Sequence, residues 1–92
     1  MFSEPRDNVI ESDEGFSVEL LGITGLVYQE AGKTFAVDSE VLAGPSGLAI
    51  YQQTIAQVHD DTREPVSRAD RERIVANIQR AFAFRGYNIQ II

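Results

Sequence analysis

Residues 65–86 read PVSRADRERIVANIQRAFAFRG, and this stretch decides the fold. Ser67 is a good N-cap, because its hydroxyl can accept a hydrogen bond from a free amide two or three residues later. Asp70 gives a weaker form of the capping box and favours the positive end of the helix dipole. Gly86 supplies a C-terminal stop, and Arg85 lies near the negative end of the dipole. The stretch therefore predicts one long helix.

One side of this helix is apolar. Its apolar residues recur at positions i, i+1, i+4, i+7 and i+8, namely Ile74, Val75, Ile78, Ala81 and Phe82. That spacing makes a single stripe along an amphipathic helix. The basic residues belong mostly to the solvated face. The helix therefore needs an apolar surface from the rest of the chain.

The residues before the helix supply that surface as strands. Phe16, Val18 and Leu20 alternate with Ser17 and Glu19, the period-two pattern of a sheet with one face in solvent. The helix stripe and this strand stripe are expected to share one core. The strand residues expected in that core are Phe16, Val18, Leu20, Phe35, Val37 and Ile50.

Other segments also have strand character. Residues 26–30 and 33–37 flank the dipeptide Ala31-Gly32, a good hairpin signal. Residues 38–42 fit either one helical turn or a continuation of the strand, and residues 43–47 read as a loop. Further strands are expected at residues 48–51, 54–58 and 87–92.

Together these segments predict an α+β fold. We expect an antiparallel sheet of four to six strands, one long C-terminal amphipathic helix packed on one face, and a final strand after the helix. The length of 92 residues suits a single domain over residues 1–92. Residues 1–7 are polar, contain Pro5 and are expected to form a flexible tail.

The composition narrows the functional classes. There are no cysteines, which removes disulfides and thiolate sites and fits a cytoplasmic protein. The single histidine, His59, excludes any site that needs two. No apolar run approaches the roughly 20 residues that span a bilayer, so no membrane association is expected. The first residues lack the apolar region of a secretory signal.

The charge is negative and unevenly distributed. The net charge is −6, made of −9 over residues 1–65 and +3 over residues 66–92. An acidic surface repels nucleic acid and speeds encounter with a basic partner. Nucleic acid is therefore not an expected partner, although a net charge of this size also serves solubility alone.

Motifs for catalysis are nearly absent. No nucleophile elbow, phosphate loop or paired-histidine spacing occurs. The run His59-Asp60-Asp61 is the only cluster that could hold a metal ion or act as acid and base. Adjacent residues in a turn point in different directions, so a solvated turn is the better interpretation. We expect no enzyme, no catalytic residue, no cofactor and no metal ion.

The order of features from residue 16 onward is similar to a known family. The pieces are residues 25–33 (GLVYQEAGK), 38–42 (DSEVL), 44–47 (GPSG), 48–51 (LAIY), 64–67 (EPVS) and 85–89 (RGYNI). In this order and spacing they resemble immunity protein family 74 of bacterial polymorphic toxin systems. The resemblance covers about residues 16–92. One departure is the absence of tryptophan, where the family often has an aromatic residue near Gln57-Val58.

The resemblance implies a non-enzymatic cytoplasmic protein that binds and neutralises a cognate toxin. Many such toxins are nucleases, which tend to be basic, so an acidic inhibitor would suit them. The residues expected to bind the partner are Glu30, Asp38, Glu40, Tyr51, Asp60 and Asp61. The alternative is a structural or regulatory module that self-associates through an edge strand, such as residues 89–92, and this leaves a homodimer open.

Overall fold

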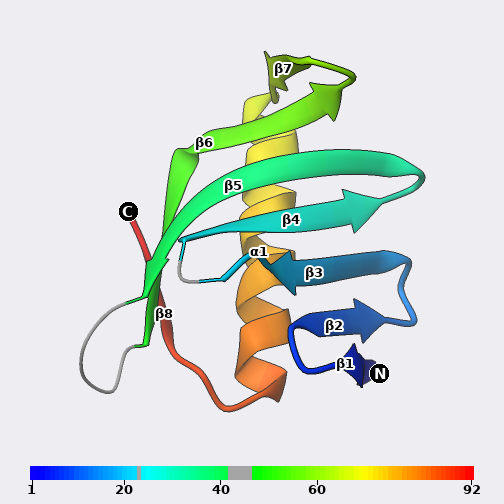
Figure 1. The fold of residues 1–92 in the computed structure, drawn as a ribbon, viewed down its shortest axis with the longest axis vertical. Coiled ribbons are helices and arrows are strands. Elements are labelled where there is room, and N and C mark those ends of the chain that lie inside the picture. The colour runs from blue at the N-terminus through cyan, green and yellow to red at the C-terminus, as the bar shows by residue number, and fades with distance from the viewer. Residues whose placement is uncertain (23, 42–46) are drawn as a thin grey trace.

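The structure, a computed structural model, describes residues 1–22, 24–41 and 47–92. The described residues form eight strands and one helix (Figure 1). The strands are β1 (Phe2–Arg6), β2 (Val9–Ser12), β3 (Phe16–Leu20), β4 (Thr24–Glu30), β5 (Lys33–Val41), β6 (Leu48–His59), β7 (Thr62–Pro65) and β8 (Ile89–Ile91). The helix α1 (Arg68–Phe84) lies between β7 and β8 in the chain.

All eight strands belong to one sheet. Strands β1 to β7 follow one another in sequence order, each antiparallel to the next, and β8 pairs with β6 in parallel. The predicted α+β class and the final strand after the helix are confirmed. The predicted sheet of four to six antiparallel strands is wrong, because the sheet is larger and mixed. Strand β8 runs in the same direction as β6, and parallel neighbours need a long connection, which β7 and α1 supply here.

Helix α1 begins and ends as predicted. The Ser67 hydroxyl accepts a hydrogen bond from the Asp70 N–H at 3.1 Å. At the other end Gly86 has a φ of +81°, and its N–H donates to the Ala83 carbonyl at 3.0 Å. Glycine adopts this left-handed conformation without the steric cost that a Cβ would bring. The capping residues read from the sequence therefore set both ends of the helix.

The N-terminal residues form a strand and not the flexible tail that we predicted. Strand β1 pairs with β2, with Phe2 opposite Ser12. The Phe2 ring lies 5.9 Å from the Phe16 ring and 5.6 Å from the Phe84 ring, centroid to centroid. A single aromatic anchor thus holds an otherwise polar segment against the molecule. Polarity and Pro5 suggested a tail because this anchor stands alone in the segment.

Strand β6 replaces the two strands that were expected at residues 48–51 and 54–58. Its pairing with β5 shifts register between Ala36 and Asp38. At this irregularity the Thr54 hydroxyl accepts from the Asp38 N–H at 2.9 Å and donates to the Tyr51 carbonyl at 2.6 Å. The hydroxyl therefore satisfies backbone groups that the ladder leaves unpaired, and the strand continues through the bend.

The hairpin between β4 and β5 is the tight turn that the sequence predicted. Ala31 and Gly32 both have positive φ, 52° and 77°. Two such residues in succession make a type I′ turn, which matches the twist of the flanking strands. Residues 38–41 continue strand β5, which resolves the choice left open by the sequence. Residue 42 and residues 43–46 of the expected loop lie outside the described residues.

The sheet curls around α1, which lies along its concave side (Figure 1). The predicted shared core is confirmed, with Leu20 and Val75 at its margin. Its helix residues are Ile74, Ile78, Ala81 and Phe82, and its strand residues are Ile10, Phe16, Val18, Leu26, Tyr28, Phe35, Val37, Leu48, Ile50 and Ile55. Burial of these side chains is the main term that stabilises the fold.

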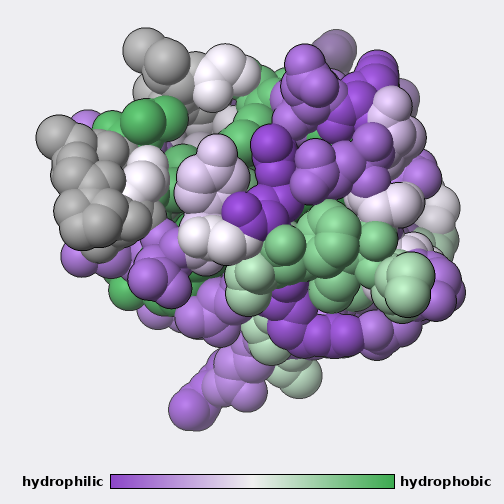
Figure 2. All heavy atoms as spheres, turned by 90° about the horizontal axis from the view of Figure 1, so that it is seen from below, coloured by the Kyte–Doolittle hydropathy of each residue, from purple (hydrophilic) through white to green (hydrophobic). Residues whose placement is uncertain are grey.

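Apolar side chains also reach the surface near the end where α1 stops. Figure 2 looks at the molecule from below and shows hydrophobic side chains at the surface beside hydrophilic ones. A small apolar hollow of about 270 Å³ opens among Leu20, Val41, Leu48, Phe82 and Tyr87. Phe84 and Tyr87 are each 47% exposed.

Candidate functional site

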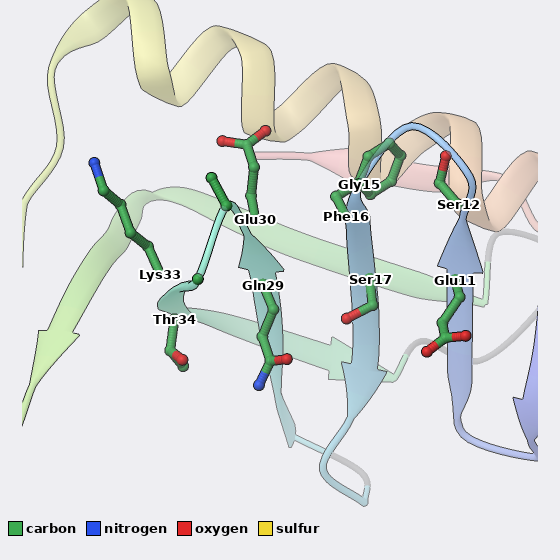
Figure 3. A pocket seen from close by; sticks show the side chains of 11 residues that line it. Glu11, Ser12, Gly15, Phe16, Ser17, Gln29, Glu30, Lys33 and Thr34 are labelled. Carbon is green, nitrogen blue, oxygen red and sulfur yellow. The ribbon is translucent and has the colours of Figure 1, made fainter.

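The strands divide their side chains between two faces. Side chains that alternate with the core residues point away from α1, and we call this side of β2 to β6 the outer face. The register shows which residues share this face, since Glu19, Val27 and Ala36 lie opposite one another on β3, β4 and β5. Figure 3 shows the alternation: Glu11 and Gln29 point away from the helix, whereas Glu30 and Lys33 point toward it.

The outer face carries acidic residues and no lysine or arginine. Its acids are Glu11 on β2, Glu19 on β3, and Asp38 and Glu40 on β5. Lys33 is the only lysine or arginine in β2 to β6, and it lies on the helix side. Within residues 1–22, 24–41 and 47–92, none of the four acids makes an ion pair. The outer face therefore presents uncompensated negative charge.

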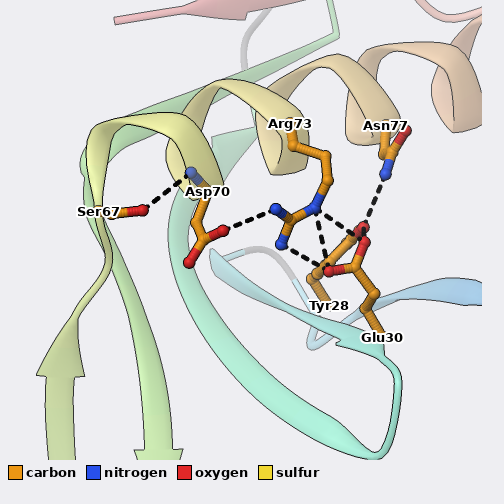
Figure 4. A network of polar contacts seen from close by, with 6 residues as sticks. All are labelled: Tyr28, Glu30, Ser67, Asp70, Arg73 and Asn77. Atoms are coloured by element: carbon orange, nitrogen blue, oxygen red, sulfur yellow. Dashed lines mark hydrogen bonds and ion pairs between the residues drawn. The ribbon is translucent and has the colours of Figure 1, made fainter.

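On the helix side of the sheet, arginines of α1 form ion pairs with nearby carboxylates. Arg73 donates to Glu30 through Nε at 3.1 Å and through Nη2 at 2.7 Å, and to Asp70 through Nη1 at 2.6 Å (Figure 4). These hydrogen bonds raise the pKa of Arg73, and the guanidinium lowers the pKa of Asp70. Arg80 pairs with Glu14 in the same way. The arginines of the basic helix are therefore largely occupied within the fold.

Tyr28 joins this helix-side network from the core. Its side chain is 0% exposed, and its hydroxyl donates to Glu30 at 2.8 Å and accepts from Asn77 at 2.8 Å. Burial, first of all, raises the pKa of Tyr28 to about 12, because the phenolate would lose its hydration. Glu30 thus has two partners inside the molecule, Tyr28 and Arg73.

Three residues of the outer face form a compact group, which we call the Tyr51 group: Asp38, Glu40 and Tyr51. Asp38 lies opposite Tyr51 in the register, and the Tyr51 hydroxyl donates to Glu40 at 2.7 Å. This hydrogen bond to the carboxylate raises the pKa of Tyr51. The group lines an open hollow of about 440 Å³ together with Gly25 and Ser39. An aromatic ring here stands between carboxylates on an otherwise open surface.

The irregularity in β6 positions this group. Thr54 ties the Asp38 backbone to that of Tyr51, so the two residues stay opposite each other where the ladder would otherwise be broken. Sequence reasoning did not identify Thr54. The sequence places Thr54 at the start of a separate strand, and nothing in the residue pattern shows that its hydroxyl bridges the gap to the strand before it.

The six residues expected to bind a partner lie in three places. Asp38, Glu40 and Tyr51 come together on the outer face. Glu30 lies on the helix side, bound to Arg73. Asp60 and Asp61 lie in the turn between β6 and β7, both exposed. The structure thus assembles half of the set, and partner binding by any of them stays a prediction.

His59, the last residue of β6, lies close to a carboxylate of β7. His59 Nε2 lies 3.6 Å from Glu64 Oε2, across the β6–β7 hairpin. Asp60 occupies a turn position with a φ of +50°. Among the residues that the structure describes, no group of three or more histidine, cysteine, aspartate or glutamate side chains is close enough to hold a metal ion.

A second open hollow, of about 600 Å³, lies where the β2–β3 and β4–β5 turns meet (Figure 3). Its charged residues are Glu11, Glu30 and Lys33. It straddles both faces, because Glu11 points to the outer face and Glu30 to the helix. Of the charged residues that line this hollow, only Glu11 therefore belongs to the acidic outer face.

The helix α1, the one helix of the described residues, is too short and too polar to cross a membrane. Comparison of the chain with protein-family models, with curated proteins and with solved structures gives no match.

Proposed function

We propose that this chain is a non-enzymatic protein-binding domain whose outer face binds a basic surface of another protein. In its narrower form the proposal is that of the sequence resemblance: a cytoplasmic immunity protein that neutralises a cognate toxin. One observation carries the proposal. Among the residues that the structure describes, the outer face holds four acids without an ion pair and no lysine or arginine, while Arg68, Arg73 and Arg80 of α1 are each paired with a carboxylate.

The composition of the outer face also suits a protein partner. Tyrosine supplies a large contact area with little conformational entropy to lose and is enriched at interfaces. Ala49 lies next but one to Tyr51 along β6, and Ala36 lies next but one to Asp38 along β5. An open, shallow surface of this kind fits a complementary protein surface better than a small ligand, which is usually enclosed. Unpaired acids steer a basic partner toward it.

The experiment begins with affinity capture by the tagged chain from its source cells at low salt. Glu40→Lys and Glu72→Lys change the net charge equally, but Glu40 is on the outer face and Glu72 is on the helix. We expect Glu40→Lys to weaken binding of the captured protein at least about tenfold, and Glu72→Lys to change it by less than about threefold. Binding of the wild type should also weaken steeply as salt rises.

Two outcomes would contradict the proposal. If both variants weaken binding equally, only the net charge matters and the outer face is not the site. If neither variant alters binding, the acids are not involved. The narrower form has its own assay, since co-expression of the chain must restore growth of cells that express the captured protein when that protein is toxic. No rescue by wild type, with binding intact, would leave a binding domain that is not an immunity protein.

A further inference from the structure

The edges of the sheet are protected unequally. Strands β1, β7 and β8 each pair along one side only among the described residues. Proteins commonly protect such edges with charged residues, proline or bulges, because a bare edge accepts a further strand. Strand β1 has Glu4, Pro5 and Arg6 and an irregular register. Strand β7 has Arg63, Glu64 and Pro65.

Strand β8 has none of these protections. It consists of Ile89, Gln90 and Ile91, and Ile92 follows in the same hydrogen-bonding pattern. It contains no charged residue, no proline and no register shift against β6. Figure 1 shows β8 at the side of the sheet, next to the first half of β6.

The pairing with β6 identifies the backbone groups that stay free. The Ile92 N–H donates to the Ile50 carbonyl at 2.9 Å, and the Gln52 N–H donates to the Ile92 carbonyl at 3.0 Å. The backbone groups of Ile92 therefore face β6, and by alternation so do those of Gln90. The N–H and C=O groups of Ile89 and Ile91 then face away from the sheet. The open edge offers two donors and two acceptors.

We propose that this edge binds β8 of a second copy, antiparallel, about a twofold axis at Gln90. In this register Ile89 of each copy lies opposite Ile91 of the other, and the two pairs close four backbone hydrogen bonds. The two Gln90 residues then lie opposite each other at the axis. Gln90 is exposed, and an amide side chain both donates and accepts, so it can pair with its own copy.

Charge favours a second copy at this edge. Two molecules of net charge −6 repel, so contact requires a region without acids. The sequence has no aspartate or glutamate from Arg73 to Ile92. The nearest outer-face acids of the sheet, on β5, are two strands from β8, roughly 10 Å. Acids of the two copies would then be five strand spacings apart, roughly 24 Å, beyond the screening length of about 8 Å at physiological salt.

Sedimentation velocity of the full chain over a wide concentration range tests the proposal. The wild type should shift from 10.2 kDa toward twice that mass as concentration rises. Gln90→Lys and Gln90→Glu should each weaken dimerisation at least about tenfold, since either places like charges directly opposite at the axis. An equimolar mixture of the two variants should recover the dimer. Gln79→Lys, an exposed substitution of the same kind on α1, should dimerise as the wild type does.

Other results would overturn the proposal. The first is a wild type that stays monomeric at all concentrations. The second is a loss of the dimer in only one of the two variants, Gln90→Lys or Gln90→Glu. The third is a mixture of the two variants that does not recover the dimer. Circular dichroism of each variant shows whether the fold is retained. The outcome is separate from the proposed function, because Glu40→Lys should dimerise normally.

Discussion

The two sides of the sheet use charge in opposite ways. On the helix side, Arg73 and Arg80 are each held by carboxylates, and Tyr28 is enclosed by Glu30 and Asn77. On the outer face, the Glu40 carboxylate accepts from the Tyr51 hydroxyl and the Asp38 N–H donates to the Thr54 hydroxyl. Neither carboxylate pairs with a cation among the described residues. Ion pairs thus accompany side-chain packing on the helix side, whereas the described acids of the outer face make none. A surface kept acidic without a structural role is free to serve a partner.

The largest expected difference between the two sides concerns apolar packing. Phe35 is 3% exposed on the helix side of β5, and Tyr51 is half-buried on the outer face of β6. Phe35→Ala should lower the free energy of unfolding by about 3–5 kcal/mol, because it leaves a cavity in the core. Tyr51→Ala should lower it by about 1 kcal/mol or less. Urea denaturation measures both, and equal losses would mean that the outer face is part of the folding core.

Alkaline pH should separate Tyr28 from the other tyrosines. The folded state raises the pKa of Tyr28 to about 12, so it holds the proton more tightly than the unfolded state does. The contribution of Tyr28 to stability is therefore full below pH 10 and is lost between about pH 10 and 12, at about 2–3 kcal/mol in all. Urea midpoints measured across that range test this. A Tyr28→Phe variant with the same pH dependence would contradict the assignment.

Removing the Tyr28 hydroxyl should have a somewhat smaller effect. Tyr28→Phe leaves Glu30 and Asn77 each without one hydrogen bond in a packed region, which costs about 1–2 kcal/mol. Tyr51→Phe removes one hydrogen bond to Glu40 at the surface and should cost less than about 0.5 kcal/mol. Thermal unfolding followed by circular dichroism compares the two. The reverse order of losses would refute the contrast between the faces.

The smallest effect on stability is expected from the acids of the outer face. Asp38→Asn with Glu40→Gln should change the free energy of unfolding by no more than about 0.5 kcal/mol, since neither carboxylate is in an ion pair among the described residues. The same pair should weaken binding of the captured protein. Glu40→Gln alone should also bring the pKa of Tyr51 back down, which ultraviolet titration detects. A large loss of stability would give these acids a structural role.

Local signals in the sequence predicted the helix and the β4–β5 hairpin correctly. Ser67, Gly86 and the Ala31-Gly32 turn each act through neighbouring backbone, so a few residues suffice to specify them. The core also followed from periodicity, because the apolar stripes of sheet and helix have nowhere else to pack. The helix, this turn and the core could therefore be predicted because their signals lie within short stretches of sequence.

The larger sheet and the Tyr51 group depend on distant contacts. Strand β1 is anchored by Phe2 against Phe16 and Phe84, and the latter is far along the chain. The bend that holds Asp38 opposite Tyr51 depends on one hydroxyl, that of Thr54. The position of Glu30 was missed for the same reason, because its partner Arg73 lies on the helix. Alternation predicts a side chain's face only when the register and the neighbouring element are known.

The parallel pairing of β8 with β6 has a consequence for the order in which the molecule opens. Strands β1 to β7 pair with their immediate neighbours in the chain, whereas β8 reaches β6 only after α1 has been traversed. Closing that long loop costs conformational entropy, and the contacts of the three residues of β8 offset little of that cost. We expect the amides of Gln90 and Ile92 to exchange with deuterium ahead of the β4–β5 ladder. Each such opening uncovers the side of Leu48, Ala49 and Ile50, an apolar stretch of β6 that β8 otherwise covers.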